Sequence, residues 1–103
     1  MSRLLPEELA RTLPALYSQE DQGEDALAIV KFFTPWTDWT WYASEYDPET
    51  RIFFGLVRGF EREYGYFSLD ELETLRGLGG RMVERDLNWT PKPLADCGRA
   101  GEI

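Results

Sequence analysis

The chain has 103 residues, 43% of them hydrophobic and 15% aromatic, and carries a formal net charge of −8. This length suits one domain over residues 1–103, and the composition excludes a disordered or fibrous chain. With one cysteine, Cys97, and no histidine, an internal disulfide and Ser–His or Cys–His nucleophile pairs are excluded, and we expect no metal or other cofactor. The longest apolar run is only a few residues, so we expect no membrane span and a cytoplasmic location.

The N-terminal part of the chain predicts a short helix, a loop and a strand. Residues 6–13 begin with a proline and two glutamates, which suit the first turn of a helix, and Pro14 ends it. The polar residues 18–25 predict a loop. The β-branched and aromatic run over residues 27–34 predicts the first strand.

Three further strands are predicted over residues 39–47, 52–60 and 64–67. The turn chemistry between the first two of these makes them an antiparallel hairpin. Gly55 and Gly59 indicate a bulge or the close approach of a large neighbour. Because side chains alternate at period two, residues 39–47 present two faces, with Trp39, Trp41 and Ala43 on one and Tyr42, Ser44 and Tyr46 on the other.

A second helix is predicted after the fourth strand. Ser68 and Glu71 form a capping box for a helix from Ser68 to about Arg76. Leu69, Leu72 and Leu75 form the apolar side of this helix, which we expect to pack against the sheet. The glycines that follow, Gly77, Gly79 and Gly80, indicate a helix stop, because a phosphate-binding loop would join a strand to a helix N-terminus.

Residues 82–87 predict an edge strand, and the two prolines within residues 89–94 predict an extended segment. Residues 97–103 are small or polar and predict a frayed tail. Together the elements predict an α+β fold: an antiparallel sheet of about four to five strands with a short N-terminal helix and one helix after the fourth strand packed on the sheet.

The negative charge is concentrated in the first half of the chain. Residues 1–50 hold ten acids against three bases, whereas residues 51–103 hold nine acids against eight bases. Such a field repels phosphate backbones, so we expect no direct nucleic-acid binding. Two interpretations of the acidic surface stay open, solubility alone or the binding of a basic partner. For the second, the candidate residues are Glu20, Asp21, Glu24, Asp25, Trp36 and Asp38.

The tryptophan-rich segment 36–42 is the most distinctive stretch of the sequence. Flat aromatic side chains bind sugars, unstacked bases or the side chains of a partner. Trp36, Trp39 and Trp41 are therefore a candidate ligand platform. The competing interpretation is that these indoles fill the core of a small domain, in which case Trp36, in the turn, is the most exposed of them.

Other candidate chemistry is weaker. Carboxylates two residues apart share a strand face and could bind a divalent cation or act as an acid and a base, but such pairs are common in an acidic chain. Three of them fit: Glu45 with Asp47, Glu61 with Glu63, and Glu84 with Asp86. Cys97 lacks a base that would generate its thiolate, so we assign it no reactivity and name no catalytic residue.

The ordered series of motifs resembles a small bacterial family, domain of unknown function 2958. The resemblance covers residues 3 to 97, and these motifs carry it: Leu16-Tyr17-Ser18, residues 30–35, 39–42, 45–47, 53–55 and 63–68, Leu72, Arg76-Gly77 and residues 84–87. It implies a gene carried on plasmids, integrative elements or phages, in conjugation or anti-restriction neighbourhoods. It implies no activity and no catalytic residue.

The leading hypothesis is a non-enzymatic accessory protein of mobile genetic elements that binds a protein partner, in DNA-transfer or host-defence machinery. One alternative is a small-molecule or carbohydrate-binding module that uses the tryptophan-rich strand. Another is a carboxylate-based, metal-dependent enzyme. The sequence leaves the partner and the oligomeric state open.

Overall fold

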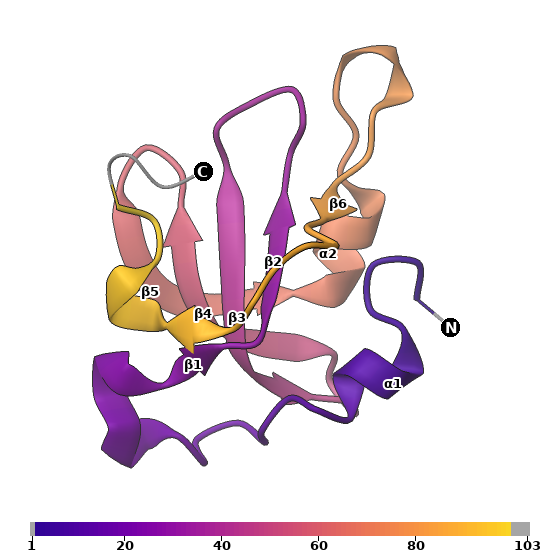
Figure 1. Cartoon of the computed structure of the whole chain (residues 1–103). Coiled ribbons are helices and arrows are strands. Elements are labelled where there is room, and N and C mark those ends of the chain that lie inside the picture. The colour runs from indigo at the N-terminus through magenta and orange to yellow at the C-terminus, as the bar shows by residue number, and fades with distance from the viewer. Residues whose placement is uncertain (1, 100–103) are drawn as a thin grey trace.

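Five antiparallel strands form the main sheet, in the order β5-β4-β3-β2-β6 (Figure 1). The computed structural model describes residues 2–99. The strands are β2 (Val30–Phe33), β3 (Thr40–Asp47), β4 (Ile52–Arg58), β5 (Arg62–Ser68) and β6 (Glu84–Arg85). The predicted α+β fold, with an antiparallel sheet and a helix after the fourth strand, is confirmed.

A second, two-stranded sheet joins distant parts of the chain. Its strands are β1 (Leu27–Ala28) and β7 (Lys92–Pro93), which pair antiparallel. Residues 27–34, predicted as one strand, are therefore two strands interrupted at Ile29. The reason is a change of partner, because β1 pairs with the proline-containing segment while β2 pairs with β3 and β6.

The helices are short. They are α1 (Glu7–Ala10), α2 (Leu69–Thr74) and the 3₁₀ turns η1 (Glu20–Asp25), η2 (Leu78–Gly80) and η3 (Leu94–Asp96). The loop predicted over residues 18–25 thus contains η1, which Gly23 interrupts with a φ of 53°. The N-terminal helix predicted over residues 6–13 is a single turn that ends at Ala10.

The helix α2 begins as predicted and ends early. The Ser68 hydroxyl accepts a hydrogen bond from the backbone N–H of Glu71 at 3.2 Å, which is the N-cap half of the capping box. Leu75 is extended, with a ψ of 132°, so the helix stops at Thr74. Leu69 and Leu72 are buried, but Leu75 is 39% exposed, and its predicted place on the apolar face is wrong.

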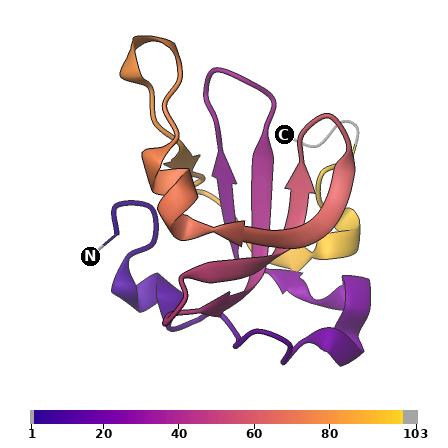
Figure 2. The same cartoon turned by 180° about the vertical axis from the view of Figure 1, so that it is seen from behind.

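Short segments of the chain lie against both faces of the main sheet (Figures 1 and 2). On one face Phe32, Trp41 and Phe53 pack against leucines of the N-terminal segment and of α2. On the other face Tyr42 and Leu56 pack against residues of the β1–β7 sheet and η3, among them Leu94. The strongly aromatic strands therefore form the central layer between two sets of short elements.

A β-bulge in β3 reverses the sides of the sheet to which the side chains of its C-terminal half point. The register with β4 shifts between Ala43 and Glu45, so Ser44 is the extra residue. After the bulge Tyr46 packs in the core cluster that holds Trp41 and Ala43. The prediction that Tyr46 shares a face with Tyr42 is therefore wrong, because an extra residue inverts the alternation beyond it.

Cys97 is fully buried, so the predicted frayed tail does not begin there. The guanidinium of Arg62 holds the backbone in place, because it donates hydrogen bonds of 2.8 Å to the carbonyl oxygens of Leu94 and Cys97. Gly98 and Arg99 are also described, and the Arg99 side chain donates to the carbonyl oxygen of Ala95. Residues 100–103 of the predicted tail lie outside the described residues.

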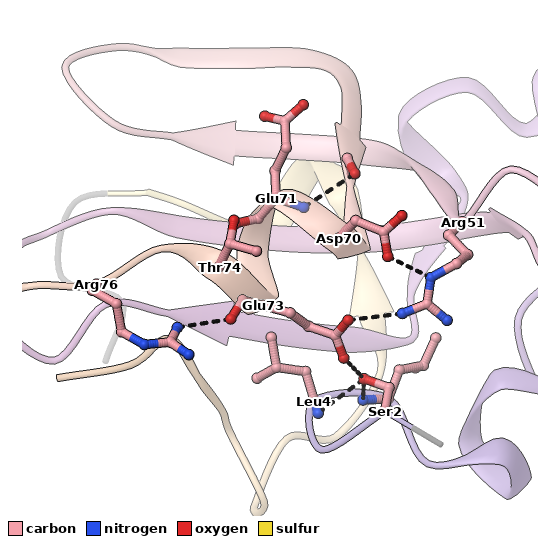
Figure 3. A network of polar contacts seen from close by, with 10 residues as sticks. Ser2, Leu4, Arg51, Asp70, Glu71, Glu73, Thr74 and Arg76 are labelled. Atoms are coloured by element: carbon pink, nitrogen blue, oxygen red, sulfur yellow. Dashed lines mark hydrogen bonds and ion pairs between the residues drawn. The ribbon is translucent and has the colours of Figure 1, made fainter. Parts of the chain in front are cut away.

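Arg51 joins the β3–β4 turn to α2 and to the N-terminal segment (Figure 3). Its guanidinium contacts Asp70 at 2.6 Å and Glu73 at 2.7 Å. Glu73 also accepts a hydrogen bond from the Ser2 hydroxyl, and the same Ser2 oxygen accepts the N–H of Leu4 and of the next residue. The hydrogen bond to Asp70 raises the pKa of Arg51 further, so the guanidinium keeps its charge in this network.

Candidate functional site

A pocket of about 290 Å³ lies between η1 and the face of β3, β4 and β5 that also packs against Leu94 of η3. Its walls are aromatic and include Tyr17, Phe54, Tyr64 and Tyr66. Three carboxylate residues also line it, Glu20 and Glu24 from η1 and Glu45 from β3. The pocket therefore combines apolar ring surface with negative charge.

Glu45 is the buried carboxylate of this pocket, with 4% of its surface exposed. One carboxylate oxygen accepts the backbone N–H of Tyr17 at 2.9 Å, and the other accepts that of Gln19 at 2.8 Å. The bulge at Ser44 aligns Glu45 with Phe54 of β4, which places both on the pocket side of the sheet. Two amide donors orient the group and leave part of its acceptor capacity for a ligand.

The rings of Tyr17, Phe54 and Tyr66 form a contiguous wall. The centroids of Tyr17 and Tyr66 are 6.4 Å apart, and those of Phe54 and Tyr66 are 5.1 Å apart. Tyr17 adopts a φ of 70°, a left-handed conformation that is unusual for a bulky residue. A hydrogen bond with Tyr17 raises the pKa of the Tyr66 phenol, followed in effect by loss of hydration and by the nearby Glu45 and Glu20 carboxylates.

Tyr64 links β5 to η1 at the same pocket. Its hydroxyl donates a hydrogen bond of 2.6 Å to the Glu24 carboxylate, and the Arg62 guanidinium lies 5.5 Å from the centre of its ring. Burial, and after it the hydrogen bond to Glu24, raises the pKa of Tyr64. The hydroxyl therefore stays protonated near neutral pH and serves as a donor to the carboxylate.

The structure divides the predicted partner-binding residues into two groups. Glu20 and Glu24 line the pocket, and Asp21 and Asp25 are exposed on the same 3₁₀ turn. Trp36 and Asp38 lie in the β2–β3 loop, at the opposite end of the sheet from η1 (Figure 1). The six residues therefore do not form one surface.

The tryptophans of the predicted platform differ in burial. Trp41 is 7% exposed and belongs to the core, whereas Trp36 and Trp39 are half-buried. Trp39 packs on Gly59 and lies 5.6 Å from the ring of Phe60, which is 96% exposed. The ligand platform remains a prediction, and Phe60 is more exposed to solvent than any of its three tryptophans.

A second cavity of about 570 Å³ contains Asp38 and carries both signs of charge. Lys31, Arg58, Arg85 and Arg99 line it together with Asp38, Glu84 and Asp86. The Lys31 ammonium lies 3.7 Å from the Asp86 carboxylate and 5.5 Å from the centre of the Trp89 ring. Its charges largely compensate one another, so it defines no ligand class.

The carboxylate pairs do not assemble a metal centre in the part of the chain that the structure describes. No group of three or more Cys, Asp or Glu side chains among residues 2–99 is placed to hold a metal ion. Glu45 accepts hydrogen bonds from backbone amides, and Asp86 pairs with Lys31.

Among residues 2–99 no helix is both long and apolar enough to cross a membrane.

The sequence pattern does not single out the aromatic wall or the buried carboxylate of the pocket. The residues that no sequence pattern assigned to a site are Tyr17, Phe54, Tyr64 and Tyr66, whereas Glu45 was named only in a carboxylate pair with Asp47. Glu45 was the one visible signal, because a carboxylate inside a strand of aromatic and small residues must be exposed or hydrogen-bonded. Its place on the pocket side depends on the bulge.

Comparison with known protein families agrees with the motif resemblance. The model of a protein family of unknown function, DUF2958, matches residues 4–97. The chain belongs to this family. No curated protein and no solved structure matches the chain significantly. Membership in DUF2958 assigns no activity, so the function has to be argued from the pocket.

Proposed function

We propose that this DUF2958 protein is a non-enzymatic interaction module that binds a basic segment of a partner protein at the pocket beside η1. One observation carries the proposal: the buried Glu45 carboxylate lies in an aromatic pocket flanked by Glu20 and Glu24. Positive groups are attracted both to carboxylates and to ring faces. The pocket is therefore complementary to a cation in two independent ways.

The distribution of charge supports the same partner class. Residues 1–50 hold ten acids against three bases, and four of these acids lie on η1, two of them lining the pocket. A concentrated negative field accelerates the encounter with a basic surface and disfavours acidic ones. We place the partner in the DNA-transfer or host-defence machinery that a protein of mobile genetic elements would meet, as the resemblance implies.

Neutralising the acids of η1 tests the proposal. A fluorescent basic peptide of alternating Lys and Gly serves as the probe, and the variant replaces Glu20, Asp21, Glu24 and Asp25 with Gln or Asn. The matched control replaces four exposed acids outside the pocket, Glu8, Glu49, Glu61 and Glu63, and changes the net charge equally. Exposed charges contribute little to stability, so both variants should fold.

We expect the η1 variant to associate more slowly with the peptide than wild type, and its association rate to depend less on salt. The control variant should keep most of the wild-type association rate and most of its salt dependence. Stopped-flow fluorescence at two ionic strengths measures the rates. Equal losses in both variants would reduce the effect to net charge, and the absence of binding by wild type at low salt would refute the proposal.

A further inference from the structure

We infer that the pocket receives the guanidinium group of a single arginine side chain of the partner, against the rings of Tyr17 and Tyr66 and beside the Glu45 carboxylate. The inference rests on the proposed function and makes it specific. It concerns the choice between arginine and lysine, which charge alone does not determine.

The lining of the pocket favours arginine. Four aromatic rings, together with Ala26 and Leu94, leave most of the wall apolar. A guanidinium is planar, weakly hydrated and able to stack on rings, whereas an ammonium is compact and strongly hydrated. Entry into an apolar pocket therefore costs the guanidinium less hydration, and it keeps the attraction to the ring faces.

The acceptors of the pocket also suit a fork of several N–H donors. Glu45 is fixed by two backbone amides, and Glu24 is fixed by the hydroxyl of Tyr64. Carboxylates that are already oriented lose little freedom when a ligand binds. A guanidinium offers five donors in a plane and can address more than one acceptor at once, which a lysine ammonium does with less geometric preference.

The chain already uses this chemistry at the edge of the pocket. The guanidinium of Arg62 lies 5.5 Å from the centre of the Tyr64 ring, and its side chain also donates to backbone carbonyl oxygens of Leu94 and Cys97. Tyr64 in turn donates to Glu24. Across the same pocket, Tyr66 and Glu45 offer a comparable combination of ring and carboxylate.

The size of the pocket fits one side chain. Its volume of about 290 Å³ lies just below the roughly 300–1,000 Å³ that pockets for whole small molecules enclose. A nucleotide or an oligosaccharide would extend beyond it. An arginine side chain presented by a peptide would place its charged end inside and leave the backbone of the peptide over the acidic η1.

Three peptides test the inference. They share the sequence Gly-Lys-Gly-X-Gly-Lys-Gly with blocked ends, and X is arginine, lysine or citrulline, the uncharged counterpart of arginine. Isothermal titration gives the affinities, and the ring resonances of Tyr17 and Tyr66 in NMR spectra report where X lies. The variant Tyr66→Ala removes a half-exposed wall, and Phe60→Ala removes a fully exposed ring outside the pocket as the control.

We expect the arginine peptide to bind about ten-fold more tightly than the lysine peptide, which corresponds to about 1.4 kcal/mol. Citrulline should bind most weakly. Tyr66→Ala should weaken binding of the arginine peptide more than binding of the lysine peptide and so abolish the preference for arginine, and Phe60→Ala should preserve the preference.

Two results would overturn the inference and they differ in what they mean. If the arginine and lysine peptides bind with equal affinity, and neutralising the η1 acids lowers both affinities, the inference about arginine is wrong and the proposed function is retained. If neither peptide binds measurably to wild type at low salt, both the inference about arginine and the proposed function are wrong.

Discussion

A Cβ atom on Gly55 would lie 1.8 Å from the carbonyl oxygen of Tyr42 on the neighbouring strand. No side chain can occupy that position, because the contact is with backbone and not with a movable group. The close approach occurs next to the bulge at Ser44, which shifts the register between β3 and β4. Gly55 thus permits the strand geometry that brings Glu45 to the pocket.

Gly55→Ala should destabilise the protein by about 2 kcal/mol or more, because the two strands must separate to admit the methyl group. Gly65→Ala is the matched control, since Gly65 pairs directly with Gly55 on β5 and a Cβ there meets no atom within 4 Å. We expect the control to change stability by less than about 1 kcal/mol. Urea denaturation compares the two, and equal losses would contradict the argument.

The bulge also shows where sequence reasoning reaches its limit. The turn at Asp47 and the cap at Ser68 were predictable, because each depends on a side chain that bonds to backbone two or three residues away. The glycine in β4 correctly indicated a bulge or a close approach. The bulge itself lies on the partner strand, and strict alternation therefore assigned Tyr46 to the wrong face.

Contacts between distant segments were beyond the reach of local patterns. The backbone oxygen of Cys97 accepts a hydrogen bond from Arg62, which is 35 residues away, and β1 forms its sheet with residues 92–93. The pocket combines residues of η1, three strands and Leu94 in the same way. Two of the six predicted partner-binding residues, Glu20 and Glu24, line that pocket, but its aromatic wall has no periodic signal in the sequence.

Glu45→Gln should lower the free energy of unfolding by about 1–3 kcal/mol. The carboxylate accepts two backbone N–H groups, one on each oxygen, and a glutamine offers only one oxygen acceptor, so a buried donor loses its partner. Glu63→Gln replaces an exposed carboxylate on β5 and should change stability by less than about 0.5 kcal/mol. Chemical denaturation of both variants measures the difference, and an unchanged Glu45→Gln protein would show that the amides are satisfied otherwise.

Stability should fall at alkaline pH in part because of Tyr46. Burial raises the pKa of its phenol above 10.0, opposed by the guanidinium of Arg51 and reinforced by Asp70, Glu73 and Asp47. As the pH rises, the Tyr46 phenol of the unfolded chain loses its proton before that of the folded chain. The stability that the protonated phenol gives is therefore fully present below about pH 10 and is lost as the pH rises through the pKa of the folded state. Tyr46→Phe should unfold with a shallower dependence on pH above 10, as followed by urea midpoints, and an unchanged slope would contradict this.

Trp36 should act as a packing partner of Gly77. A Cβ on Gly77 would lie 2.3 Å from Cδ2 in the middle of the Trp36 indole, so the loop before η2 fits the ring only without a side chain. Gly77→Ala should therefore cost about 1–3 kcal/mol in wild type. In the Trp36→Ala background the same substitution should cost much less, because the ring that obstructs the methyl group is gone. Denaturant midpoints of the two single variants and the double variant give the coupling energy directly. Strictly additive losses would mean that the two residues do not touch in solution, and would return Trp36 to the solvent-facing role of a ligand platform.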